Sequence, residues 1–237
     1  MCQAKTKAVK TQLVFLVVSF IVMRVFAQPV KDSLERYLRI LDYRPNDLPA
    51  LSKAAEYSIY LGGREEEASK KKIYFEQSLA YAEKCKMLYP HAWQTYIALA
   101  AAFGGMQQLS KDKSFKKSCA INVKLWIDQA VKINPNYAAS WSMLGMWHYR
   151  MTNLGTVESL FAGELKKEAS LLKAYQCLEK AIQLNEHEAR FYFLLAMISR
   201  KMNLKNEARS HLLKAIEQTG GTDPFFIQKC EEQLVKI

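Results

Sequence analysis

The sequence has few histidines and lacks the recognisable motifs of catalytic and metal sites. It contains only four histidines, His91, His148, His187 and His211, and they lie far apart. H-E-x-x-H, a glycine-rich phosphate loop, G-x-S-x-G and C-x-x-C are all missing. We therefore expect no catalytic residues, no metal, no cofactor and no enzymatic activity. The alternative, a hydrolase that uses His148 with nearby carboxylates, is weaker than the interpretation of His148 as a core or groove-lining side chain.

A second absence concerns β structure. Strict alternation of polar and apolar residues, which is typical of a half-buried strand, occurs nowhere in the sequence. Apolar residues recur at helical spacing instead, and half of all positions are hydrophobic. The pattern predicts an all-α protein with enough apolar residues to fold.

The third feature is an internal repeat. Three prolines lie 45 residues apart, and a large apolar residue follows each of them by six positions. These pairs are Pro45 with Leu51, Pro90 with Tyr96, and Pro135 with Trp141. A fourth run begins at Tyr192, with Ala196, Ala208 and Ala215 at the small-residue positions of a tetratricopeptide unit. The repeat predicts a tetratricopeptide-like α-solenoid of antiparallel helix pairs.

The register of the repeat divides the chain into units. We expect a half unit at 31–45, four units at 48–90, 92–135, 138–186 and 189–221, and a capping helix at 223–237, about nine helices in all. Long intra-repeat inserts occupy 62–72, 104–118 and 152–170. The first should form a solvated helix stabilised by ion pairs. The third is amphipathic and should fold back over the solenoid, the alternative being contact with a partner.

The N-terminus is typical of a secretory signal peptide covering residues 1–27. Three lysines precede the apolar run 13–23, and Val25-Phe26-Ala27 forms a cleavage site before Gln28. The expected location is periplasmic or secreted, and cleavage would lower the formal net charge from +11 to +7. The alternative is a membrane anchor formed by residues 13–27, although eleven apolar residues fall short of the roughly 20 that span a bilayer.

Four cysteines remain in the mature chain, each on a separate predicted helix: Cys85, Cys119, Cys177 and Cys230. Because cysteine is commonly a small core residue, we expect buried free thiols.

The concave surface of the solenoid is the expected binding site. Placing the first helices in register assigns Tyr149, Arg150, Arg190, Phe193, Met197, Arg200 and Lys201 to this surface. Basic groups beside Met and aromatic side chains suit a protein or peptide that carries carboxylates. For Arg200 and Lys201, a solvated helix end is an equal alternative. Nucleic acid is not expected, since no run of Lys and Arg has interleaved aromatics, and a membrane is expected only if the N-terminal segment stays uncleaved.

The helix order from about 96 to 218 resembles the regulator of microtubule dynamics family. The resemblance rests on the helix containing Trp126-Ile127-Asp128-Gln129-Ala130, the helix containing Leu144-Gly145-Met146-Trp147, and the long insert containing Leu160-Phe161-Ala162. It implies a tetratricopeptide-like fold without catalytic residues, in a family whose eukaryotic members are linked to microtubules and mitochondria.

The resemblance also implies an alternative function, a cytoskeleton-associated protein. Basic patches at 111–117 and 200–205 would then meet acidic tubulin tails. The export signal, however, resembles that of a bacterial envelope protein, which favours a relative that keeps the fold without the microtubule role.

Overall fold

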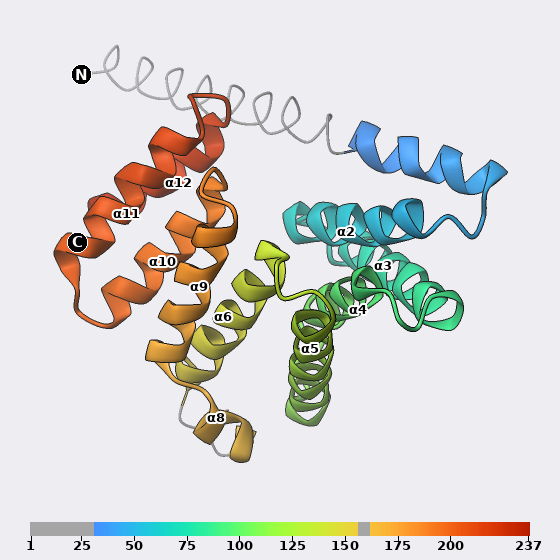
Figure 1. Ribbon diagram of the computed structural model, residues 1–237, viewed down its shortest axis with the longest axis horizontal. Coiled ribbons are helices and arrows are strands. Elements are labelled where there is room, and N and C mark those ends of the chain that lie inside the picture. The colour runs from blue at the N-terminus through green and yellow to red at the C-terminus, as the bar shows by residue number, and fades with distance from the viewer. Residues whose placement is uncertain (1–30, 156–161) are drawn as a thin grey trace, which may run out of the picture.

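The computed structural model describes residues 31–155 and 162–237, and within these ranges it is helical with no strand (Figure 1). The predicted signal peptide lies outside the described residues. A first helix covers 31–43. The helices that follow are α2 (Leu48–Arg64), α3 (Ala68–Leu88), α4 (Trp93–Met106), α5 (Lys113–Ile133), α6 (Ala138–Thr152), α8 (Glu164–Glu168), α9 (Leu171–Leu184), α10 (Ala189–Lys201), α11 (Lys205–Gln218) and α12 (Pro224–Leu234).

The helices pack as antiparallel pairs, α2 with α3, α4 with α5, α6 with α9 and α10 with α11. Neighbouring pairs join where α3 meets α4, α5 meets α6 and α9 meets α10. The predicted all-α solenoid is therefore confirmed. Four pairs and one helix at each end account for ten helices in the described ranges, and α8, which forms within the third insert, brings the number to eleven, against the expected nine or so.

Capping side chains set where several helices begin. Asp47 accepts a hydrogen bond from the Ala50 amide at 2.9 Å at the start of α2. Asp223 accepts one from Phe226 at 3.0 Å, and Pro224 occupies the first turn of α12. Both arrangements satisfy an amide that has no partner within the helix. The capping helix and its Asp-Pro start are as predicted.

Small residues let the paired helices approach closely. Ala196, Ala208 and Ala215 are fully buried, as the repeat predicts, and Leu212 fills the space beside them. Gly145 performs the same task in the preceding pair, since a Cβ atom there would collide with Leu178. These contacts are the seams that hold each pair together.

The first two inserts lengthen helices instead of forming separate loops. α3 and α5 are both 21 residues long, because each begins well before the point where its repeat register starts. The expected solvated helix is present at the start of α3, where Glu67 pairs with Lys70 at 2.7 Å and Lys72 pairs with Glu76 at 3.6 Å. The actual break is at Glu65–Glu67, so Gly62 lies inside α2.

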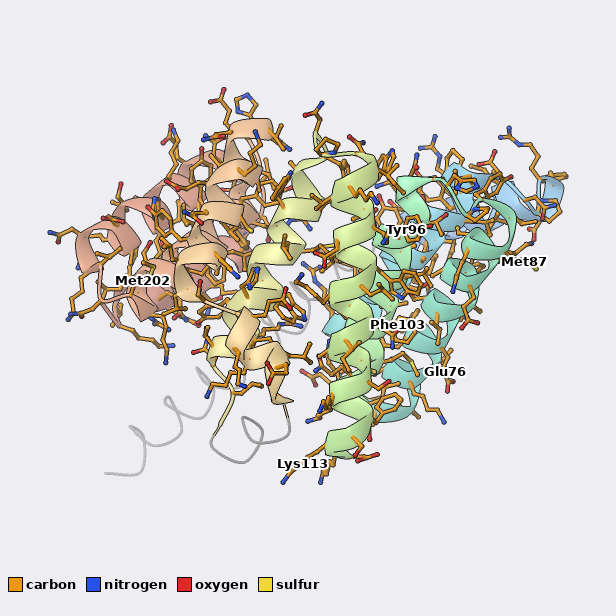
Figure 2. The ribbon with its side chains drawn as sticks, turned by 60° about the horizontal axis from the view of Figure 1, so that its bottom comes forward. Glu76, Met87, Tyr96, Phe103, Lys113 and Met202 are labelled. Carbon is orange, nitrogen blue, oxygen red and sulfur yellow. The ribbon has the colours of Figure 1, made fainter. Side chains whose placement is uncertain are left out.

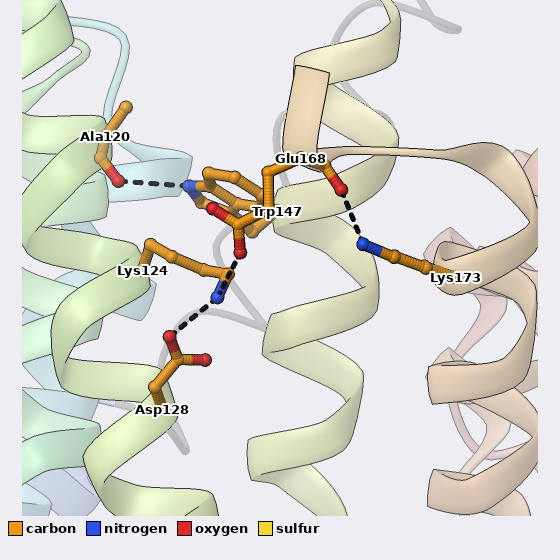
Figure 3. Close-up of polar contacts among 6 residues, drawn as sticks. All are labelled: Ala120, Lys124, Asp128, Trp147, Glu168 and Lys173. Atoms are coloured by element: carbon orange, nitrogen blue, oxygen red, sulfur yellow. Dashed lines mark hydrogen bonds and ion pairs between the residues drawn. The ribbon is translucent and has the colours of Figure 1, made fainter. Parts of the chain in front are cut away.

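The described part of the third insert folds back onto the solenoid, as predicted. Leu165 and Ala169 pack on the buried cluster around Trp147. Lys124 of α5 pairs with Glu168 at 2.8 Å and with Asp128 at 2.6 Å (Figure 3). The insert is thus fastened to α5 by both apolar and ionic contacts. Val157, Leu160 and Phe161, which contribute to its predicted amphipathic face, lie outside the described residues.

All four described cysteines are buried and free, which confirms the prediction for the thiols. Burial raises the pKa of Cys85, Cys177 and Cys230 to about 11. Such thiols stay protonated at neutral pH and are poor nucleophiles. Their task is packing.

Among the described helices, none has the length and apolar character needed to span a membrane.

Candidate functional site

Two of the expected binding residues lie on first helices of the pairs and have exposed side chains. Arg150, near the end of α6, and Arg190, near the start of α10, both have exposed side chains. Arg190 is close enough to Glu56 of α2 for the carboxylate to raise its pKa. Helices from the first and last units therefore border a common space.

Arg190 is not a free guanidinium group. Its Nε lies 2.8 Å and its Nη2 2.9 Å from the two carboxylate oxygens of Glu188, which also accepts a hydrogen bond from the Arg190 amide. The hydrogen bonds to Glu188 raise the pKa of Arg190 and lower that of Glu188. A ligand carboxylate would have to share or displace this bidentate pair.

Arg150 is in the opposite situation. Its guanidinium group forms no ion pair or hydrogen bond with any residue of the described ranges. It is open to water on one side, yet the surrounding protein reduces its hydration enough to lower its pKa. An incompletely hydrated, unpaired cation gains more from an anionic partner than a surface arginine does.

The other expected contacts are mostly covered. Phe193 is only 8% exposed and packs against Phe226 of α12, with 5.5 Å between the ring centroids. Met197 is half-buried in the same cluster, and the Arg200 Nη1 atom donates to Gln233 of α12 at 2.8 Å. Phe193 is thus a core residue and is unavailable to a partner while α12 is in place. The reason is that α12 occupies the position where a further unit would place its first helix.

The last two expected contacts differ from each other. Tyr149 is half-buried and packs against the cluster shared by α9 and α10. Lys201 is exposed at the end of α10. Of the seven residues, Arg150, Arg190 and Lys201 have exposed side chains, and Tyr149 contributes mainly to packing.

Sequence reasoning missed the part of the inner surface formed by α2. The register position that Arg150 occupies on α6 is occupied on α2 by Tyr60, and Glu56 precedes Tyr60 by one helical turn. Arg64 stacks its guanidinium carbon 4.3 Å from the Tyr60 ring centroid.

The two ends of the solenoid meet across this inner surface. The same Arg64 carbon is 6.0 Å from the ring centroid of Phe225, at the start of α12. Tyr137, the residue before α6, also lies close to α2 and α10. Burial is the main cause of its raised pKa, and the charges of Glu56 and Lys53 on α2 and of Arg190 on α10 are near enough to act on it as well. Aromatic and charged side chains from α2, α6, α10 and α12 therefore converge.

His148 lies in the core rather than at this surface. It is 5% exposed, and its Nδ1 atom has no hydrogen-bond partner among the described residues. Burial, with a smaller contribution from Lys124 and Lys173, lowers its pKa to about 4. The nearby carboxylates of Glu168 and Asp128 act in the opposite direction without cancelling this effect. The neutral ring packs edge-on against Trp147, whose Nε1 atom donates to the Ala120 carbonyl at 3.0 Å (Figure 3).

The depressed pKa of His148 predicts a loss of stability in mild acid. The unfolded chain binds a proton near pH 6.5, whereas the folded chain resists it down to about pH 4. Stability therefore falls as pH drops through this window, by about 2 kcal/mol between pH 6.5 and pH 4.5. Urea unfolding at both pH values should show this loss, and His148→Gln should show a smaller one. Equal losses in the two proteins would contradict the assignment.

Groups of three or more potential metal ligands do not occur in the described part of the chain.

Comparison with known proteins identifies the fold and the family. A solved structure of TTC0263, a thermophilic TPR protein in Thermus thermophilus, superposes with a TM-score of 0.67 and 18% identity, covering 92% of this chain and 96% of that one. MamA from Desulfovibrio magneticus RS-1 is more distant, with a TM-score of 0.47, 15% identity and coverage of 83% and 97%. At 18% identity, the likeness to TTC0263 shows a shared fold, that of a tetratricopeptide-type helical repeat. No curated protein matches the sequence. The family model for Regulator of microtubule dynamics protein 1-3 matches residues 24–237, so the chain belongs to this family.

Proposed function

We propose that the protein is a non-enzymatic scaffold that binds a protein or peptide segment on the inner surface of its solenoid. Arg150 is the observation that carries the proposal. It is exposed, unpaired among the described residues and incompletely hydrated, in the last turn of α6, the first helix of its pair. A carboxylate from a partner would supply the ion pair that the fold itself leaves out.

The chemistry around Arg150 suits an acidic segment with some apolar character. Arg64 is a second guanidinium group on a first helix, and the rings of Tyr60 and Phe225 flank it, whereas Arg190 is already paired with Glu188. Arginine pairs carboxylates in a planar, bidentate manner, while aromatic rings bury apolar side chains at a low cost in conformational entropy. An extended peptide that alternates acidic and apolar residues fits this surface best.

Charge reversal at Arg150 tests the proposal. We expect Arg150→Glu to weaken binding of the protein's partners by roughly tenfold or more, because it replaces an attractive ion pair by a repulsive one. The partners are first captured with the chain beginning at residue 28, identified, and then titrated against each variant by calorimetry.

The matched control is Arg209→Glu, an identical charge change at an exposed position on α11, the second helix of its pair. Binding by this variant should match that of the unchanged chain. Equal affinities for the Arg150 and Arg209 variants would reject the inner surface as the binding site.

A second candidate function follows from the family match. The family is named for the regulation of microtubule dynamics, and this chain carries four lysines at 111–117, three of them exposed, that would suit acidic tubulin tails. Such binding would be largely electrostatic and would weaken as salt rises. Salt-sensitive co-sedimentation of the protein with microtubules supports this candidate.

We further propose that the protein is exported and that residues 1–27 are removed, leaving a periplasmic or secreted chain. The lysines before a short apolar run and the small residue at position 27 support this proposal. Sequencing the N-terminus of the purified native protein separates the alternatives. A start at Gln28 in an envelope fraction supports export and excludes the microtubule role, whereas an intact N-terminus in the membrane fraction supports anchoring by residues 13–27.

A further inference from the structure

A pocket of about 270 Å³ lies away from the inner surface, where the α4–α5 pair meets α6 and the third insert. Its walls include Ala120 on α5, Met151 at the end of α6, and Leu154, Ala162 and Leu165 around the insert. Ala120, Met151 and Ala162 are each only 5–6% exposed, so the floor of the pocket is part of the core. The interior is therefore apolar and built from well-packed side chains.

The rim of this pocket is basic. Lys113, Lys116 and Lys117 line it, and no acidic residue is among its lining residues. Figure 2 shows Lys113 at the tip of α5, at the edge of the molecule. The acid next to this rim in sequence is Asp112, whose carboxylate is engaged at 2.9 Å by the Ser114 amide at the start of the helix.

The position of these lysines in α5 is electrostatically unfavourable for the helix. All three lie within its first five residues, at the positive end of the helix dipole, where acidic side chains are the stabilising choice. Neither the Lys116 nor the Lys117 ammonium group forms an ion pair within the described ranges. Anions that bind at the rim would therefore interact with both the lysines and the helix terminus.

We propose that this pocket binds an acidic peptide segment, with one large apolar side chain inserted into the pocket and flanking carboxylates on the lysine rim. The volume supports a single side chain, because it falls just below the range of roughly 300–1,000 Å³ that holds drug-sized ligands. A large apolar anchor in a desolvated pocket, surrounded by charged contacts, is the usual arrangement of a binding hot spot.

The site is independent of the inner surface and of the function proposed there. Its lining residues come from α4–α5, the end of α6 and the insert, and Arg150 is not among them. Loss of binding at the pocket would leave the Arg150 result unchanged, and the converse also holds.

The test uses a fluorescent probe peptide with a central phenylalanine flanked on each side by four acidic residues, titrated with the chain from residue 28. We expect binding to this probe, a loss of at least about tenfold when the central residue is alanine, and no binding when the flanks are lysines. Lys116→Glu/Lys117→Glu should weaken binding at least about tenfold. This variant should fold, because acidic residues suit the start of a helix.

Two further variants sharpen the result. Lys132→Glu/Lys180→Glu makes the same charge change at exposed positions on α5 and α9 and should leave binding unchanged. Gln108→Trp, at an exposed position on the pocket wall, should fill the pocket and weaken binding without altering charge. Equal binding of the phenylalanine and alanine probes, or equal weakening by both lysine pairs, would overturn the proposal. Binding of dodecanoate without binding of any peptide would also overturn it, in favour of a fatty-acid site.

Discussion

Replacement of Phe75 by alanine is expected to lower the free energy of unfolding by about 3–5 kcal/mol, the usual loss for a fully buried phenylalanine. Phe75 has no exposed surface and lies between two pairs of helices. A Cβ atom added at Gly62 of α2 would be 2.5 Å from its Cε1 atom, and one added at Gly105 of α4 would be 3.0 Å from its Cδ1 atom. The ring thus joins α2, α3 and α4, and its removal leaves a cavity that rigid helices cannot fill. Chemical denaturation followed by circular dichroism measures the loss.

Ile73→Ala is the matched control for Phe75→Ala. Ile73 lies on the same helix two residues earlier and is 54% exposed, so its truncation should change stability by no more than about 0.5 kcal/mol. Similar losses in the two variants would show that Phe75 does not join the helices in this way.

Gly145→Val is expected to destabilise the protein by about 2–3 kcal/mol, through overpacking of the seam between α6 and α9. A Cβ atom at this position would collide with Leu178, which has no exposed surface into which it could move. It would also lie 3.0 Å from the Ala174 carbonyl oxygen and 3.2 Å from the Cys177 Cβ atom. The backbones of α6 and α9 must separate to make room, and thermal unfolding should occur at a lower temperature.

A second helical glycine provides the contrast. An added Cβ atom at Gly104 in α4 meets no atom within 4 Å, so Gly104→Ala should stabilise the protein by up to about 1 kcal/mol through the higher helix propensity of alanine. If Gly145→Val proved as stable as the unchanged chain, close packing of α6 on α9 would be refuted.

The helix pairs and their seams could be predicted from the sequence because both are local consequences of spacing. A bulky residue such as Trp141 and a small one such as Ala208 recur in a register that specifies which face of each helix is buried. The cap on α12 depends only on Asp223 and Pro224, which are neighbours in the chain. The structure confirms all of these features.

The inserts were harder to predict, because a glycine can either end a helix or make room for a neighbouring side chain inside one. Gly62-Gly63 has the composition of a loop, and the first insert was expected to begin there. Gly62 is in fact buried inside α2, where the absence of a side chain makes room for Phe75. Only knowledge of the residue that packs against Gly62, thirteen positions later, distinguishes a helix break from a close approach.

The expected binding surface could likewise be predicted only in part. Arg150 and Arg190, which the repeat register assigns to the inner surface, have exposed side chains, but the register does not take account of the helix that follows the last unit. The capping helix α12 covers Phe193, and its Gln233 engages Arg200. The repeat register also does not predict the contact between Arg64 and Phe225, because that contact depends on the curvature of the whole solenoid.

The sequence by itself determined the helical class, the pairing order and the buried small residues, since each follows from periodicity within one or two neighbouring helices. Only the tertiary structure decided which inner-surface side chains remain free, that α2 and α12 border one space, and that the insert and α5 enclose a lysine-rimmed pocket. These features arise from contacts between residues far apart in the chain, and such contacts depend on small rotations between successive pairs that accumulate along the solenoid.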